Sequence, residues 1–173
     1  MTLRIACCPG TYDPVTNGHL DIVARARGCF DRVLVAVLVN PSKQPLFGVD
    51  ERVAMLEEAV RGLPAAAGTV EVDSFVGLLV DYARAREVTA LVKGLRAVSD
   101  FDFELQMAQM NYRLARVETM FMTTNPAYSY LSSSLVKDVA RNGGDVTGLV
   151  PAGVAARLKE RFAGGEGRRP GGL

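Results

Sequence analysis

The sequence predicts an α/β fold: a doubly wound, Rossmann-like sheet of five parallel strands in a single domain. Short runs rich in Val, Leu, Ile and Ala alternate with helix-length segments along the chain. This alternation is typical of a parallel sheet covered by helices on both faces. Parallel crossovers are almost always right-handed, which favours the doubly wound arrangement. The length of 173 residues suits one domain with a single core.

The first strand and helix are the most clearly marked pair. We expect a strand over residues 4–8, because its last four residues are apolar. A loop from Pro9 onward, rich in glycine and proline, separates it from a helix over 18–30. Within that helix the apolar residues recur at intervals of three and four, as on one buried face.

The later elements repeat this alternation of strand and helix. Further strands are expected over 32–39, 70–75, 90–92 and 118–122, and helices over 50–61, 78–86, 100–114, 133–142 and 154–162. Met107 and Met110 share one face of the helix over 100–114 and are expected in the core or in a subunit contact. We expect one domain over 1–162, followed by a disordered Gly- and Arg-rich tail over 163–173.

The composition argues against nucleic acid and membranes as binding partners. The net charge of +1 lacks the basic excess of most nucleic-acid-binding proteins. No apolar run approaches the roughly 20 residues of a membrane helix, and the N-terminus lacks a signal-peptide pattern. Three cysteines, two of them adjacent, match neither a disulfide framework nor a zinc site. We therefore expect a cytoplasmic protein that binds neither nucleic acid nor membrane.

The predicted topology gathers the conspicuous polar residues at one edge of the sheet. Ligands of open parallel sheets bind at the carboxyl ends of the strands. The loops after the five strands carry, in order, Thr11 to His19, Pro41 to Lys43, Gly77 to Leu79, Lys93 to Arg96, and Tyr128 to Ser134. We expect these loops to form one site.

His19 points to an anionic ligand at that site. It is the single histidine of the chain and falls in the first turn of the helix over 18–30. Free N–H groups and the helix dipole favour phosphate there, and the histidine can donate to a phosphate oxygen. A lone histidine can also simply cap a helix or pack, but the strand–loop–helix context favours the phosphate.

Three further clusters fit phosphate, each with a plainer alternative. Lys43 can hold a phosphate from the side opposite the helix, or be solvated in its loop. Lys93 and Arg96 suit a polyphosphate, although a salt-bridged pair would look similar. The hydroxyls of 132–134, followed by Lys137, can bind a triphosphate at a helix start, or only cap that helix.

Two of these motifs carry a family resemblance. Thr16-Asn17-Gly18-His19 and Ser132-Ser133-Ser134-Leu135-Val136-Lys137 resemble the two signature boxes of the nucleotidylyltransferase superfamily. With Pro9 to Pro14, Pro41 to Lys43 and Gly94 to Arg96, the chain resembles the bacterial phosphopantetheine adenylyltransferases over residues 3–162. The resemblance implies transfer of AMP from ATP to 4′-phosphopantetheine, giving 3′-dephospho-CoA and pyrophosphate in the penultimate step of coenzyme A synthesis.

The resemblance also implies individual roles. The acceptor would be bound by Thr11, Lys43, Leu79 and Lys93, and ATP by Thr11, Tyr12, His19, Gly94, Leu95, Arg96, Glu104, Tyr128, Ser129, Tyr130, Leu131, Ser132, Ser133 and Ser134. Mg²⁺ would be the cofactor, CoA a feedback inhibitor and the assembly a homohexamer. Lys93 stands where many relatives have arginine, and Phe103 where some have tyrosine, so the roles of these two positions are open.

The chemistry needs no general base, because an acceptor phosphate already carries negative charge. We expect direct in-line attack on the ATP α-phosphate, with His19 stabilising charge and Lys43 holding the nucleophile as the two catalytic residues. Two alternatives stay open. One is a nucleotidylyltransferase with another acceptor, such as nicotinamide mononucleotide or the alcohol phosphate of a cytidylyltransferase. The other is a non-catalytic module that senses ATP.

Overall fold

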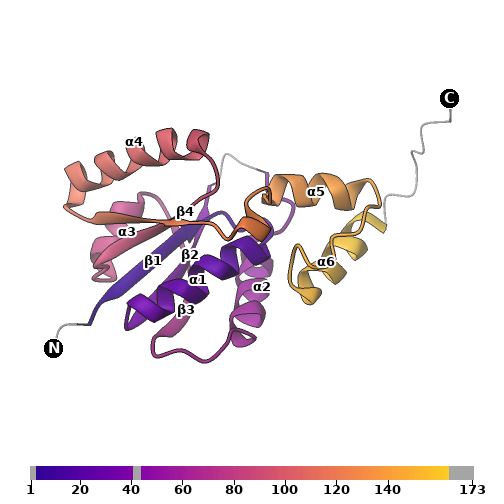
Figure 1. Ribbon diagram of the computed structural model, residues 1–173, viewed down its shortest axis with the longest axis horizontal. Coiled ribbons are helices and arrows are strands. Elements are labelled where there is room, and N and C mark those ends of the chain that lie inside the picture. The colour runs from indigo at the N-terminus through magenta and orange to yellow at the C-terminus, as the bar shows by residue number, and fades with distance from the viewer. Residues whose placement is uncertain (1–2, 41–43, 164–173) are drawn as a thin grey trace.

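The computed structural model describes residues 3–40 and 44–163, and it contains the predicted five-stranded sheet (Figure 1). All strand pairs are parallel, in the order β3-β2-β1-β4-β5. The strands are β1 (Ile5–Gly10), β2 (Arg32–Val39), β3 (Thr69–Val76), β4 (Ala90–Leu95) and β5 (Glu118–Thr123). Of the tail expected over 163–173, Ala163 is the last residue of a helix, and residues 164–173 lie outside the described residues, as does Lys43.

Six α-helices and one 3₁₀ helix connect and cover the described strands. They are α1 (Asn17–Cys29), α2 (Val49–Arg61), α3 (Leu79–Ala85), α4 (Val98–Ala115), the 3₁₀ helix η1 (Pro126–Tyr128), α5 (Ser133–Arg141) and α6 (Ala152–Ala163). The five strands and six α-helices expected from sequence are all confirmed, and none of their ends differs from the expected one by more than three residues. The short η1 was not predicted.

Helices cover both faces of the sheet, as the doubly wound prediction requires. On one face, buried residues of α1, α2, α5 and α6, such as Val23, Leu56, Val136 and Leu158, form the larger core cluster. On the other face, Val80 and other residues of α3 pack with strand residues in a smaller cluster. Figure 1 shows α3 and α4 together across the sheet from α1 and α2.

A gap in strand pairing creates space at the centre of the sheet. β1 pairs with β4 only at Ala6–Ala90 and Cys7–Leu91, although both strands continue beyond these pairs. The chain leaves β1 toward α1 on one face and leaves β4 toward α4 on the other. This point, where the crossovers diverge, is the place where open α/β sheets bind ligands.

Within residues 3–40 and 44–163, no helix combines the length and the apolar composition that a membrane-spanning helix needs.

Candidate active site

A cavity of about 320 Å³ opens where β1 and β4 separate. Its walls are the ends of these two strands, the first turns of α1 and α5, part of α4 and the segment after β5. The predicted residues that line it are Tyr12, His19, Lys93, Gly94, Arg96, Glu104, Tyr128, Leu131, Ser132, Ser133 and Ser134. Residues from three of the five predicted loops, those after β1, β4 and β5, therefore meet in one cavity.

Other predicted site residues lie outside the lining of this cavity. Of those that the structure describes, they are Thr11, Leu79, Leu95, Ser129 and Tyr130. Leu79 begins α3 beyond the edge strand β3, and β2 separates that strand from β1. Thr11 is exposed, and its backbone carbonyl accepts a hydrogen bond from buried Arg52 at 2.7 Å.

The loop before α1 orients His19. Thr16 caps the helix and His19 is its third residue, so the two form a reciprocal capping box. The Thr16 backbone N–H donates to His19 Nδ1 at 3.0 Å. Because Nδ1 is an acceptor, we assign the proton of the neutral imidazole to Nε2. His19 thus lines the cavity as a hydrogen-bond donor.

The surroundings of His19 keep its imidazole neutral. Burial, followed by the positive charges of Arg96 and Lys93, lowers its pKa from 6.5 to about 4. Each of these causes disfavours the imidazolium form. At pH 7 the side chain therefore offers a neutral N–H donor, with no charge of its own to be compensated.

Tyr12 forms a rigid wall beside His19. Its ring meets the imidazole edge-on, with ring centroids 5.0 Å apart, and its hydroxyl donates to the Cys8 carbonyl at 2.7 Å. The backbone at Tyr12 is left-handed, with φ of 51°. A Cβ at Gly10 would lie 3.0 Å from the Tyr12 ring, so the glycine makes room for this wall.

The two cations of the cavity are both paired with carboxylates of α4. Lys93 Nζ lies 3.1 Å from Glu104, and Arg96 makes a two-pronged contact with Asp100 at 2.9 and 3.0 Å. Arg96 also donates to the Leu131 carbonyl at 3.1 Å. The salt-bridged alternative considered from sequence is therefore present, and the four formal charges cancel.

The start of α5 gives the cavity a second helix N-terminus. Ser132 caps the helix by accepting the Leu135 N–H at 3.1 Å, and the Ser133 hydroxyl donates to the Pro14 carbonyl at 2.8 Å. Positive ends of helix dipoles at α1 and α5 thus border the same space, an arrangement that favours phosphate. Lys137 was grouped with these serines, but it is not in the lining and its ammonium contacts Asp13 at 2.7 Å.

Among the lining residues that the sequence analysis gave no role in ligand binding are two polar ones, Asp100 and Thr124. Asp100 was considered only as a helix cap, yet it lies in the first turn of α4 and its carboxylate pairs with Arg96, which directly follows β4. Thr124 follows β5 directly, so the rule that sites lie at strand ends could have found it. Over residues 3–40 and 44–163, no three His, Cys, Asp or Glu side chains gather into a group that could hold a metal ion.

The fold matches that of a known class of enzymes. The cytidylyltransferase-like family model matches residues 7–139, from β1 to α5. A bifunctional NMN adenylyltransferase/ADP ribose pyrophosphatase of Francisella tularensis, crystallised with AMP and a manganese ion, shares the fold. Its TM-score is 0.66 at 12% identity, over 94% of this chain and 52% of that chain. The chain is thus a nucleotidyltransferase of the cytidylyltransferase-like family.

Sequence similarity to curated proteins narrows this class. A phosphopantetheine adenylyltransferase of Frankia casuarinae is 60% identical over 161 residues, which cover 93% of this chain and 99% of that protein. One of Streptomyces coelicolor is 58% identical over 160 residues, covering 92% and 98%. The chain belongs to the phosphopantetheine adenylyltransferase family.

Proposed function

We propose that this chain transfers AMP from ATP to 4′-phosphopantetheine, giving 3′-dephospho-CoA and pyrophosphate in coenzyme A synthesis. The observation that carries the proposal is the identity of about 60% with phosphopantetheine adenylyltransferases over more than nine-tenths of the chain. The cavity supports the proposal, because a neutral histidine donor and two helix N-termini border it. Hydrogen-bond donors and the positive ends of helix dipoles favour the binding of a triphosphate.

The reaction proceeds by direct in-line attack of the acceptor phosphate on the ATP α-phosphate. The acceptor oxygen forms the new P–O bond, and the bond to pyrophosphate breaks. The attacking oxygen is already negatively charged, so the enzyme contributes position and charge stabilisation. His19 donates its Nε2 proton in a hydrogen bond to an α-phosphate oxygen as charge develops there.

Individual ligand contacts remain proposals. The residues proposed to bind ATP that also line the cavity, a position that supports this role, are Tyr12, His19, Gly94, Arg96, Glu104, Tyr128, Leu131 and Ser132 to Ser134. The residues proposed to bind the acceptor are Thr11, Lys43, Leu79 and Lys93. Thr11 and Leu79 lie outside this cavity. If they bind the acceptor, its pantetheine arm extends out of the cavity. The role of Lys43 stays a prediction.

Mg²⁺ is proposed as the cofactor, and it would arrive bound to the phosphates of ATP. Magnesium in such sites is commonly held by one or two carboxylates and by substrate phosphates, not by a cage of protein ligands. The lack of a three-residue metal cluster in the described ranges is compatible with this. When bound, the ion offsets phosphate charge that the paired Lys93 and Arg96 leave uncompensated.

A homohexamer restrained by CoA is proposed from family resemblance. Exposed apolar side chains on α4 and β5, namely Phe103, Met107, Met110, Leu114 and Met120, support a subunit contact there. A cytoplasmic location stays a prediction from the cysteine content.

Pyrophosphate release tests the proposed function. Purified protein, ATP and Mg²⁺ are combined with either 4′-phosphopantetheine or nicotinamide mononucleotide. We expect release with phosphopantetheine alone. Release only with the mononucleotide would overturn the acceptor, and ATP binding without release on either acceptor would favour a nucleotide-sensing module.

A further inference from the structure

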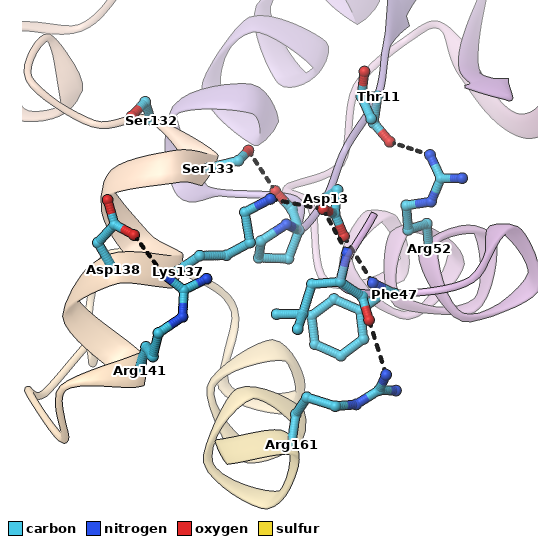
Figure 2. Close-up of polar contacts among 12 residues, drawn as sticks. Thr11, Asp13, Phe47, Arg52, Ser132, Ser133, Lys137, Asp138, Arg141 and Arg161 are labelled. Atoms are coloured by element: carbon cyan, nitrogen blue, oxygen red, sulfur yellow. Dashed lines mark hydrogen bonds and ion pairs between the residues drawn. The ribbon is translucent and has the colours of Figure 1, made fainter. Parts of the chain in front are cut away.

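Asp13 is a buried carboxylate that joins three separate segments of the chain (Figure 2). It lies in the loop after β1 and is 4% exposed. Its side chain accepts the backbone N–H groups of Leu46 and Phe47, both at 2.9 Å, and the ammonium of Lys137 at 2.7 Å. The loop before α1, the segment before α2 and helix α5 therefore share one buried charge.

The segment before α2 is fastened from a second side as well. Arg161 of α6 donates to the Leu46 carbonyl at 2.8 Å and lies over the Phe47 ring at 4.9 Å. Phe47 itself is buried, with 1% exposure. Because these contacts hold the two amide donors in place, Asp13 has a firm support against which α5 can be positioned.

Helix α5 meets the loop after β1 at two points on one helix face. Lys137 binds Asp13, and Ser133, four residues earlier, donates to the carbonyl of Pro14 at 2.8 Å. Residues four apart lie on the same face of a helix, so the two contacts fix both the distance and the rotation of α5. Ser133 lines the cavity, and so does Tyr12, the neighbour of Asp13.

We propose that Asp13 and Lys137 are a positioning pair, which holds the α5 N-terminus and the loop after β1 at the separation that in-line transfer requires. Lys137 then acts through Asp13 and not by contact with a substrate phosphate. The proposal rests on the proposed function for its kinetic consequence. In a reaction that depends on position, misplacement by about 1 Å can cost on the order of 10²-fold in rate.

A double-mutant cycle separates this role from direct phosphate binding. The variants are Lys137→Met, Asp13→Asn and the two combined. Arg141→Met is the matched control, because Arg141 pairs with exposed Asp138 on the same helix at 2.9 Å. Residues that act as a unit give non-additive losses.

We expect Lys137→Met to lower kcat by about 10- to 100-fold, with KM for ATP within about threefold of the wild type. The double variant, which leaves no unpaired buried charge, should lose no more than the worse single variant. Lys137→Arg should recover most of the rate, and Arg141→Met should match the wild type. Additive losses, or a rise in the KM for ATP of about tenfold or more, would show that Lys137 contacts ATP and would overturn the proposal.

Two further measurements do not require the enzyme to turn over, so their results do not depend on which acceptor it uses. Calorimetry gives the Kd of ATP, and hydrogen exchange reports the amides of Leu46 and Phe47. If Asp13 and Lys137 are a positioning pair, the Kd of ATP should be nearly unchanged in Lys137→Met. Hydrogen exchange at the Leu46 and Phe47 amides should be faster in Asp13→Asn. A strongly weakened ATP complex or unchanged exchange would contradict it. A wild-type protein without turnover on 4′-phosphopantetheine would contradict the proposed function alone.

Discussion

At the scale of single residues, His19 shows how a local motif sets chemistry. The capping box with Thr16 uses Nδ1 as an acceptor, which leaves the proton on Nε2. Burial and two nearby cations lower the pKa and keep the ring neutral. The neutral ring already carries the Nε2 proton, so it can donate a hydrogen bond to the developing phosphate charge without first being protonated.

The pKa of His19 can be measured without ambiguity, because the chain contains one histidine. We expect its ring signal to titrate by NMR with a midpoint near 4 in the free protein. ATP should raise this midpoint, because phosphate charge favours the imidazolium. A midpoint near 6.5 in the free protein would contradict the burial of the ring beside Arg96 and Lys93.

The same shift makes stability depend on pH. The unfolded chain binds a proton at His19 near pH 6.5, whereas the folded chain binds it near pH 4. The free energy of unfolding should therefore fall as the pH decreases from 6.5 to 4. Urea unfolding at several pH values checks this, and His19→Gln should lack this part of the decrease.

At the scale of secondary structure elements, the site depends on the close approach of β4 to α1. A Cβ at Gly94 would lie 3.0 Å from Cγ1 and 3.3 Å from Cδ1 of Ile22. Ile22 lies on α1, three residues after His19, so the contact transmits any displacement toward His19. Gly94 therefore serves packing between elements as well as access to the cavity.

Gly94→Ala should displace α1 or strain Ile22 and lower the free energy of unfolding by about 1–3 kcal/mol, the usual cost of overpacking. Chemical denaturation measures this change. Ile22→Val in the same chain should relieve part of the loss. Gly28→Ala is the control on α1, because its Cβ would meet nothing within 4 Å. Equal effects of the two alanines would contradict this account.

At the scale of the whole molecule, the exposed side chains of α4 and β5 are the feature that a single chain leaves unexplained. Phe103 is 64% exposed and Met110 54% exposed, although both are large apolar residues. Such a patch is typical of a surface that another protein covers. A second copy of the chain is the occupant that the proposed homohexamer supplies.

Met110→Glu should therefore dissociate the assembly, because it places a charge in an apolar contact. Sedimentation velocity should show a hexamer for the wild type and smaller species for the variant. Leu3→Glu, at an exposed apolar residue near the N-terminus, should leave the mass unchanged. A monomeric wild type, or a variant that keeps its mass, would contradict the proposed contact.

The alternation of strands and helices was enough to predict the architecture, but the site needed information that spacing does not contain. The strand expected to end at Val92 continues to Leu95, because Lys93, Gly94 and Leu95 pair with β5. Lys93 and Gly94 interrupt the apolar pattern from which a buried strand is predicted. The extension forms because β5 pairs with it, and the local sequence does not show this pairing. Likewise, Lys137 pairs with Asp13 across 124 positions of sequence, so its motif alone suggested a phosphate ligand.

The turnover of His19→Ala tests whether His19 donates a hydrogen bond to the transition state. With ATP, Mg²⁺ and 4′-phosphopantetheine, we predict a loss of about 10²–10³ in kcat and a much smaller change in the Kd of ATP. His19→Gln, which retains an N–H donor, should lose less. Turnover of His19→Ala within about threefold of the wild type would contradict this account of catalysis.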